Sequence, residues 1–423
     1  MTDVAALARV RGSVRVPGDK SYSHRAVLLS ALAEGSSTLT GLSPGADVAA
    51  TLGAVARLGA TVEPDEDRVR VSGPTRGLRA SAEPLECANS GTTMRLLCGV
   101  VAGIAGSHRL VGDASLSRRP MDRVAAPLRL MGARLSGEGP TLHPPLLVEG
   151  GPLAGVEYHV PVPSAQVKSA VLFAGLGAAG STTVVEAVRT RTTTEDTMRE
   201  AGLALGVAEE GTGRRVTLAP GRPAARGWFV PGDPSQAAFF AVLGAIHEDA
   251  SLEVVSLDAA PERVGFVAVL ARMGGRVTLH DHGSFHSLSA LSSTLAATEV
   301  HSREIPSVDE VPILTVAACA AEGVSAFREM AELRVKESDR FAGSMELARR
   351  LGATAWAEGD DFFVEGLGAA RRFAPFALDA ALDHRMVMAA AIAGAAGRGC
   401  SITGAATVET SYPHFLRDLA LLA

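Results

Sequence analysis

Lysine is the scarcest charged residue in this chain of 423 residues, where it supplies only three of the 40 basic side chains. Arginine therefore serves wherever any surface cation would do, and the three lysines need another reason. The arginine fork is planar and always charged, whereas the lysine ammonium is compact and can approach a reacting oxygen or give up a proton. We therefore expect the chemistry of this protein to gather around Lys20, Lys168 and Lys336.

Other scarcities exclude whole classes of protein. Aromatic residues make up 4% of the chain, which predicts a core of small aliphatic side chains. A net charge of -6 provides no basic surface for a nucleic-acid backbone, and no nucleic-acid-binding motif is present. Charged residues interrupt every apolar stretch within about 18 residues, and the first residues do not form a leader, so we expect no membrane span and a cytoplasmic location.

Cysteine is also rare, and its spacing fits neither a zinc motif nor a redox pair. We therefore expect free, buried thiols. The four cysteines are Cys87, Cys98, Cys319 and Cys400.

The chain is longer than one hydrophobic core usually supports, which predicts two domains. It also repeats itself: six serine or aspartate residues, 69 to 74 positions apart, each precede a run of helix-forming residues. Serine and aspartate are common helix N-caps, so six helices are expected to begin there. The six residues are Ser21, Ser90, Ser164, Ser235, Asp309 and Asp383, and the expected helices are 25–32, 92–103, 167–177, 237–246, 311–321 and 385–396.

A second landmark is a glycine that follows an apolar residue and precedes an alternating apolar segment. This pattern predicts a second helix that ends at a glycine before a strand. Each repeat then reads strand, helix, strand, helix and strands, giving an α/β protein with mixed sheets. The similar segments 16–19 and 230–233, both Val-Pro-Gly-Asp, divide the array into two sets of three. The glycines are Gly59, Gly132, Gly202, Gly274 and Gly352.

Cations accompany the expected helix starts. Arg25, Arg95, Lys168 and Arg385 lie within about one turn of a start, where acidic residues are usual because the helix dipole is positive there. An anionic ligand would reverse this unfavourable arrangement. The sequence therefore indicates an enzyme that binds small phosphorylated anions.

Seven motifs, in order along nearly the whole chain, resemble the enolpyruvyl transferases, and among them the 5-enolpyruvylshikimate-3-phosphate synthases. The resemblance implies two domains of three βαβαββ repeats each, with the active site in the cleft between them. It places the first domain at 1–18 plus 231–423 and the second at 19–230, with crossovers near 18–20 and 228–232. The motifs are 17–25, 89–92, 112–121, 164–169, 309–310, 334–340 and 383–385.

The resemblance also implies a reaction. The enolpyruvyl group of phosphoenolpyruvate passes to the 5-hydroxyl of shikimate 3-phosphate and phosphate is released, with no metal or organic cofactor, by a monomer that binds neither nucleic acid nor membrane. Carbon 3 of the enol gains a proton and later loses it, which calls for a carboxyl group. By similarity this group is Glu337, while Asp309 takes the proton of the attacking hydroxyl and Lys20 assists departure of phosphate.

Substrate-binding residues follow from the same resemblance. Bidentate arginines suit the phosphate and carboxylate of phosphoenolpyruvate, and Arg119, Arg340 and Arg385 match that role. Gly91 admits the same ligand close to the backbone. Lys336 lies between the two substrates, and is expected to share a helix face with Arg340. The residues expected around the 3-phosphate of the other substrate are Ser21, Arg25, Ser164, Gln166 and Arg191, and Lys20, Ala165 and Asp309 are also expected to bind substrate.

Two residues and two functions stay open at this stage. Lys168 either reaches the shikimate phosphate or supports the residues that do, and His384 is either catalytic or a packing residue. The related UDP-N-acetylglucosamine enolpyruvyl transferases are an alternative, although they usually carry Lys-Asn where this chain has Lys20 and Ser21. A non-catalytic anion-binding scaffold is the other alternative, but it would not need acids aimed at an anion.

Overall fold

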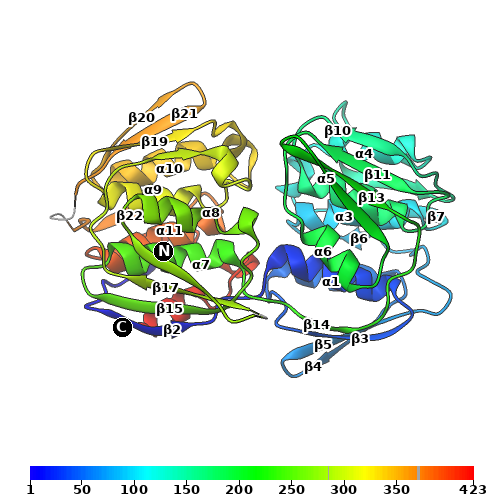
Figure 1. The fold of residues 1–423 in the computed structure, drawn as a ribbon, viewed down its shortest axis with the longest axis horizontal. Helices are drawn as coiled ribbons and strands as arrows, with labels where there is room; N and C mark the ends of the chain where they lie inside the picture. Colours follow the sequence, from blue (N-terminus) through cyan, green and yellow to red (C-terminus); the bar gives the residue numbers. More distant parts are fainter. Residues whose placement is uncertain (284, 369–371) are drawn as a thin grey trace. The chain divides into compact units, whose positions relative to one another are not determined.

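The computed structural model describes residues 1–283, 285–368 and 372–423 and divides the chain into two compact units (Figure 1). Unit 1 comprises Met1–Pro17 and Pro231–Ala423, and unit 2 comprises Gly18–Val230. Each unit has a hydrophobic core of its own. Alanine, valine and leucine dominate both cores, which confirms the small-aliphatic interior expected from the composition.

Unit 2 contains three sheets with the same plan. In each sheet an edge strand pairs in parallel with its neighbour, which then pairs with an antiparallel hairpin. In spatial order the sheets are β14 (Gly227–Phe229), β3 (Gly35–Thr40), β5 (Arg68–Gly73) and β4 (Thr61–Asp65); β6 (Leu85–Glu86), β7 (Gly106–Val111), β9 (His143–Gly150) and β8 (Arg134–Glu138); and β10 (Glu157–Val160), β11 (Thr182–Glu186), β13 (Gly213–Leu218) and β12 (Leu205–Glu210).

Unit 1 repeats this plan twice and closes with a shorter sheet. In the third sheet the N-terminal strand β1 takes the place of the hairpin and pairs antiparallel with β23. The six sheets confirm the predicted sixfold α/β repeat. The unit 1 sheets are β2 (Val10–Val14), β15 (Ala250–Leu257), β17 (His286–Leu291) and β16 (Arg276–Asp281); β18 (Glu299–His301), β19 (Val324–Arg328), β21 (Asp361–Glu365) and β20 (Thr354–Glu358); and β1 (Thr2–Val4), β23 (Cys400–Thr403) and β22 (Phe376–Asp379).

The first helix of each repeat is largely buried. Such a helix needs apolar residues around its whole circumference, and α11, with its run of buried alanines, shows how small side chains let neighbouring helices pack closely. These six inner helices are α1 (Lys20–Leu32), α3 (Gly91–Ala102) and α5 (Ala165–Gly175) in unit 2, and α7 (Pro234–Ile246), α9 (Val311–Ala320) and α11 (His384–Ala396) in unit 1.

The second helix of five repeats ends as predicted. Each is followed by a glycine with a positive φ between 78° and 111°, in the left-handed region where a Cβ atom is disfavoured. These helices are α2 (Ala46–Arg57), α4 (Asp122–Leu130), α6 (Thr193–Glu200), α8 (Gly265–Arg272) and α10 (Arg340–Arg350). The remaining helical segments are α12 (Phe415–Ala420) and the 3-10 turns η1 (Leu116–Arg118), η2 (Pro261–Arg263), η3 (Ser302–Glu304), η4 (Ala331–Val335) and η5 (Ala405–Thr410).

Three of the six predicted N-caps are confirmed and three are wrong. Ser90, Ser164 and Asp383 cap α3, α5 and α11. Ser21 and Ser235 instead lie inside α1 and α7, the second residue of each helix.

The aspartate of each Val-Pro-Gly-Asp segment is the actual cap in the two shifted helices. Asp19 accepts the Tyr22 N–H at 2.6 Å, and Asp233 accepts the Ser235 N–H at 2.8 Å. An aspartate two residues ahead of a serine reaches the free amides first. Asp309 lies one residue before Glu310, the N-cap position of α9, and an arginine binds its carboxylate as described below.

Each of the two Val-Pro-Gly-Asp segments follows a strand that pairs within its own unit. β2 precedes the first segment and pairs in parallel with β15 of unit 1, and β14 precedes the second segment and pairs in parallel with β3 of unit 2. The ends of unit 2 meet, because a Cβ on Gly18 would lie 2.9 Å from Val230 Cγ1. The ends of the unit 1 segments meet as well, since Pro17 O accepts the Asp233 N–H at 2.9 Å.

All four cysteines are free and buried, as the sequence indicates. A search of the described residues finds no helix with the length and apolar character needed to cross a membrane.

Candidate functional site

The starts of the inner helices in unit 2 carry a linked set of cations and hydroxyls. Arg191 Nη1 donates to Ser21 Oγ at 3.1 Å, and Arg25 Nη1 donates to Ser21 O at 2.8 Å. Arg25 is 3% exposed, and its other nitrogens donate to Thr194 Oγ1 at 2.5 Å and Ser169 Oγ at 2.6 Å. The predicted residues Ser21, Arg25 and Arg191 therefore lie together, and α5 and α6 hold the Arg25 fork.

A second linked set surrounds the start of α3. Gln166 accepts from Arg95 Nη1 at 2.7 Å and donates to Thr92 Oγ1 at 2.9 Å, which joins the first turns of α5 and α3. A Cβ on Gly91 would lie 2.9 Å from Arg95 Nη1 and 3.3 Å from Arg119 Nη1. A side chain at position 91 would therefore displace two guanidinium groups.

The remaining predicted residues of unit 2 lie beside these two sets. Arg119 Nη2 donates to Asn89 Oδ1 at 2.5 Å. Ser164 is the N-cap of α5, Ala165 is its first residue, and Ala165 O accepts the Ser169 hydroxyl at 2.6 Å. Ala165 offers no polar side-chain atom, so only its backbone can contact a ligand by hydrogen bonding.

Lys20 is the first residue of α1 and forms an ion pair with Asp47 of α2. Its side chain is 26% exposed. One turn further along α1, His24 is fully buried and lies 2.7 Å from Thr51 Oγ1. Burial, with the nearby Lys20 charge adding to it, lowers the pKa of His24 to about 3, so this ring is neutral near pH 7.

Lys168 is completely buried and does not present its ammonium group to solvent. Its Nζ donates to Glu195 Oε1 at 2.7 Å, Glu186 Oε2 at 2.8 Å and Arg191 O at 3.0 Å. Arg214 completes the cluster, with Nε 3.7 Å from Glu186 and Nη1 3.9 Å from Glu195. Of the two interpretations left open by the sequence, this burial favours support of the residues that bind the phosphate.

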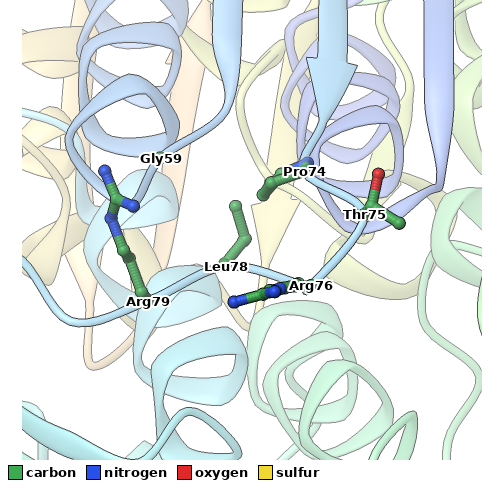
Figure 2. A pocket seen from close by; sticks show the side chains of 7 residues that line it. Gly59, Pro74, Thr75, Arg76, Leu78 and Arg79 are labelled. Atoms are coloured by element: carbon green, nitrogen blue, oxygen red, sulfur yellow. The ribbon is translucent and has the colours of Figure 1, made fainter.

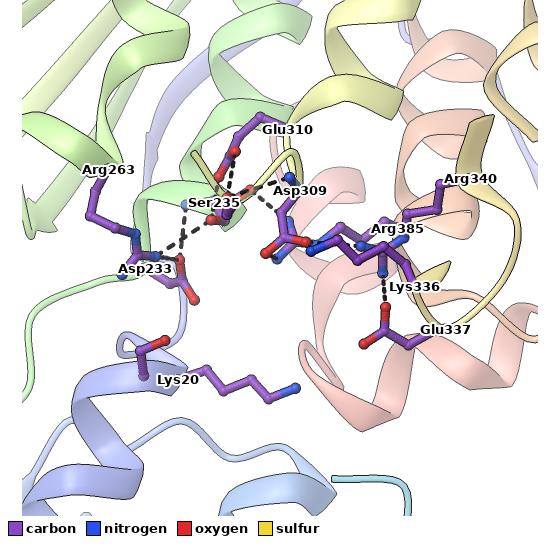
Figure 3. A network of polar contacts seen from close by, with 12 residues as sticks. Lys20, Asp233, Ser235, Arg263, Asp309, Glu310, Lys336, Glu337, Arg340 and Arg385 are labelled. Carbon is purple, nitrogen blue, oxygen red and sulfur yellow. Dashed lines mark hydrogen bonds and ion pairs between the residues drawn. The ribbon is translucent and has the colours of Figure 1, made fainter. Parts of the chain in front are cut away.

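In unit 1 the central cation is Arg340, the first residue of α10, whose side chain is 1% exposed (Figure 3). Its fork contacts Asp383 twice, at 2.8 Å from Nε and 3.2 Å from Nη2. Nη1 donates to Asp309 at 2.9 Å, and Nη2 forms an ion pair with Glu337 at 2.7 Å. One arginine therefore joins the two predicted catalytic acids of unit 1.

The opposite charges in this cluster shift the pKa values of Arg340 and Asp383. Burial alone would lower the pKa of Arg340, but attraction to Asp383, Glu337 and Asp309 outweighs it and raises that pKa above its ordinary value. Burial would likewise raise the pKa of Asp383, and the Arg340 charge overcomes this effect, so the pKa stays below the usual range. Both groups are therefore charged near pH 7.

Two further residues lie at the start of α11. Arg385 Nη2 lies 3.7 Å from Asp309 Oδ2, so the predicted residue Arg385 belongs to the same cluster. His384 is 6% exposed, and burial lowers its pKa to about 4. A neutral ring at pH 7 is a packing group or a hydrogen-bonding group there, not a cation.

Lys336 does not share a helix face with Arg340, contrary to the expectation from their spacing. Lys336 has an extended backbone and follows turn η4, whereas α10 begins only at Arg340 because Asp339 caps it by accepting the Ala342 N–H at 3.0 Å. The Lys336 ammonium donates to Glu332 at 2.9 Å, and its side chain is 19% exposed.

A network missed by the sequence analysis connects the starts of α7 and α9. Ser235 donates to the buried Glu310, and Ser307 donates to the other Glu310 oxygen at 3.1 Å. Arg263 Nη2 donates to Asp233 at 2.8 Å (Figure 3). The likeness of the two Val-Pro-Gly-Asp segments could have identified Asp233, but no local pattern predicts a partner 30 residues away.

A cavity of about 360 Å³ lies elsewhere in unit 2, lined by Gly59 and residues 74–79 (Figure 2). Arg76 and Arg79 are its only charged lining residues. None of the predicted site residues lines it, so it is not the candidate site.

The two units offer complementary chemistry. Unit 2 presents Lys20, Arg25, Arg119 and Arg191 beside the first turns of buried helices, where free amides add to the attraction for anions. Unit 1 combines cations with carboxylates that are partly exposed. Cations suit anionic substrates, and partly exposed carboxyl groups suit proton transfer to them.

Comparison with known proteins gives a consistent result. A family model described as EPSP synthase (3-phosphoshikimate 1-carboxyvinyltransferase) matches residues 4–419. A 3-phosphoshikimate 1-carboxyvinyltransferase from Synechococcus sp. (strain WH7803) is 41% identical and is covered completely, as is this chain. Another, from Streptococcus equi subsp. equi (strain 4047), is 39% identical over 98% of this chain and 97% of the relative.

Solved structures agree. An EPSP synthase from Acinetobacter baumannii superimposes with a TM-score of 0.88 at 36% identity, over 100% of this chain and 98% of that one. The enolpyruvyl transferase NikO from Streptomyces tendae superimposes with a TM-score of 0.77 at 18% identity, over 100% of this chain and 97% of that one, and this likeness concerns the fold alone.

Proposed function

The chain belongs to the EPSP synthase family and catalyses that family's enolpyruvyl transfer from phosphoenolpyruvate to shikimate 3-phosphate, and we propose how its residues divide this work. The observation that carries the proposal is the Arg340 cluster, in which one buried cation joins Asp309 and Glu337. A site for two anionic substrates that also requires proton transfer needs this combination of charges.

The phosphate of shikimate 3-phosphate is assigned to Ser21, Arg25 and Arg191. The support is that both arginines already donate to Ser21, Arg191 to its hydroxyl group and Arg25 to its backbone carbonyl, so two guanidinium groups lie beside this residue. A phosphate replaces some of these contacts with charge-assisted hydrogen bonds. Ser164, Ala165 and Gln166, at the start of α5, are assigned to the same substrate.

Phosphoenolpyruvate is assigned to Arg119, Arg340, Arg385 and the backbone at Gly91. Arginine forks match both its phosphate and its carboxylate. The lack of a side chain at position 91 leaves the amides at the start of α3 open to an anion. Lys336, whose side chain is partly exposed, is assigned a place between phosphoenolpyruvate and shikimate 3-phosphate.

The catalytic assignments follow the changes in bonding. The 5-hydroxyl oxygen bonds to carbon 2 of phosphoenolpyruvate and loses its proton, which Asp309 accepts. Carbon 3 gains a proton from Glu337, and the same residue takes a proton back from carbon 3 as the carbon–oxygen bond to phosphate breaks. Lys20 stabilises the charge on the departing phosphate.

Phosphate release tests the proposed function directly. The protein is mixed with phosphoenolpyruvate and shikimate 3-phosphate, and we expect phosphate release that requires both substrates. Release only with UDP-N-acetylglucosamine as acceptor would overturn the assignment in favour of the related transferases, and binding without release would favour a non-catalytic scaffold.

Three further predictions accompany this function. We expect activity to survive treatment with EDTA, because the proposed steps need only side chains of this chain. We expect light scattering to report a monomer. We expect fractionation of cells to recover the protein in the cytoplasm.

A further inference from the structure

The buried cluster around Lys168 lies next to Arg25 and Arg191, the two arginines assigned to the shikimate phosphate. It comprises Lys168 of α5, Glu186 at the end of β11, Glu195 of α6 and Arg214 of β13. All four side chains are at most 7% exposed. Two positive and two negative charges balance, which is the condition under which ionised groups are tolerated away from water.

The two cations of this cluster fix the backbone of Arg191. Lys168 Nζ donates to Arg191 O at 3.0 Å, and Arg214 Nη2 donates to Thr190 O at 3.1 Å. These two carbonyls belong to the peptide planes on either side of the Arg191 Cα atom, so both planes are anchored. The Thr190 hydroxyl also donates to Glu186. The direction in which the Arg191 side chain leaves the backbone is therefore set by buried charges.

The same cluster sets the spacing on which Arg25 depends. Lys168 of α5 contacts Glu195 of α6, and the neighbouring residues Ser169 and Thr194 both contact the Arg25 fork. Ser169 and Thr194 also lie 2.6 Å apart, oxygen to oxygen. A change in the distance between α5 and α6 would therefore move the hydroxyls that orient Arg25.

The geometry points to Lys168 as a positioning residue that makes the enzyme selective for a phosphorylated acceptor, an inference that rests on the proposed function. Lys168 itself does not touch the substrate. It holds Arg25 and Arg191 in the arrangement that receives a phosphate group. The site also offers a reason why lysine persists here in an arginine-rich chain: three acceptors surround a single ammonium nitrogen, whereas a guanidinium spreads its donors over a larger planar fork.

The test compares kcat/KM for two acceptors, shikimate 3-phosphate and shikimate. It uses a double variant in which the net charge of the buried cluster is unchanged. Lys168→Met with Glu195→Gln removes one charge of each sign and leaves Glu186 with Arg214. We expect kcat/KM for shikimate 3-phosphate divided by that for shikimate to fall about 10- to 100-fold, because small misplacements of binding groups cost about this much. Hydrogen exchange at the amides of residues 187–192 should also become faster.

Val184→Ala is the matched control, because Val184 is a buried residue of β11 close to Glu186 that contributes no polar group. It should destabilise unit 2 but keep the wild-type ratio of the two acceptors. Thr190→Val is a second variant that keeps all four charges and is nearly isosteric. It should lower the ratio by a smaller factor, and it decides the question if the double variant does not fold.

The outcomes distinguish the positioning role of Lys168 from the proposed function of the enzyme. A folded variant that keeps both the wild-type acceptor ratio and the wild-type exchange rates would overturn the positioning role. Absence of turnover in the wild-type protein would overturn the proposed function instead. In that case calorimetric affinity for shikimate 3-phosphate and the exchange rates of residues 187–192 still decide whether Lys168 positions the loop: unchanged values in a folded variant count against it, and a weaker affinity with faster exchange supports it.

Discussion

The two units each bury a cluster of ionised side chains, and the clusters differ in balance and in exposure. Around Lys168 two cations meet two carboxylates, and all are sealed from solvent. Around Arg340 two arginines, Arg340 and Arg385, meet three carboxylates, and two of these, Asp309 and Glu337, are 20% and 29% exposed. A cluster that is buried and balanced in charge stabilises the local structure. A cluster with an excess of carboxylates, some of them partly exposed, can also exchange protons with a substrate.

The strongest way to test this difference is to neutralise one open acid. Glu337→Gln keeps the size of the side chain but removes the proton donor, so we expect turnover to fall about 10²- to 10⁴-fold. Stability should change little, because Arg340 keeps Asp309 and Asp383. Phosphate-release kinetics and urea unfolding measure the two quantities. Glu346→Gln, on α10, is the control, and near-normal turnover of the Glu337 variant would contradict the contrast.

Removing the central cation tests the cost of the unbalanced charges. Arg340→Met leaves Asp383, which is fully buried, without its bidentate partner, and we expect a loss of about 3–5 kcal/mol in the free energy of unfolding at pH 7. The folded-state pKa of Asp383 is lowered, so its stabilising contribution is present above the ordinary pKa of about 3.9 and disappears as the pH falls through the lowered value. The deficit should therefore shrink in acid, and a deficit independent of pH would count against this explanation.

Two buried histidines, His24 in unit 2 and His384 in unit 1, allow the pH dependence of stability to be compared between the units. The folded-state pKa values of His24 and His384, about 3 and 4, lie below the ordinary value of about 6.5. Between the ordinary pKa and the lowered folded-state pKa, the unfolded chain binds a proton that the folded chain does not. The contribution of the neutral histidine to the free energy of unfolding is therefore complete above about pH 6.5 and decreases as the pH falls below that value. Each histidine contributes about 1.4 kcal/mol per pH unit. His24→Asn should remove one such slope in urea unfolding from pH 6.5 to 5, and an unchanged slope would be inconsistent with a buried neutral ring.

The smallest effect is expected at an exposed ion pair of α10. Arg350 Nε lies 2.7 Å from Glu346, the same distance as between Arg340 and Glu337, but both side chains are about half exposed. Arg350→Ala should change the free energy of unfolding by about 0.3–0.5 kcal/mol. Thermal unfolding at low and high salt measures it. A loss as large as that of Arg340→Met would show that distance, and not burial, determines the energy.

The parts of this molecule that could be predicted are those in which a residue acts on its own neighbourhood. Ser90 and Ser164 cap the helices that follow them, and the glycines after the second helices end them. Where two capping residues stand close together, as at Asp19 and Ser21, a local rule cannot rank them. The partners of Lys168 come from positions 186, 195 and 214, and no spacing in the sequence predicts contacts among separate strands and helices.

The scarcity of lysine was informative but incomplete. It drew attention to three positions, and at Lys20 and Lys336 the side chains are partly exposed. At Lys168 the same constraint arises from packing, because a compact cation is needed among three buried acceptors. Residue type alone cannot separate these two reasons, since burial depends on the whole fold.

The meeting of Gly18 with Val230, and of Pro17 with Asp233, has a consequence for how the chain could be cut and rejoined. Residues 18–230 begin and end at neighbouring positions, and the two segments of unit 1 that flank them also end close to each other. Removal of residues 18–230 leaves Pro17 and Pro231 close enough for a short peptide to join them, and the excised segment has ends that a similar bridge could close into a ring.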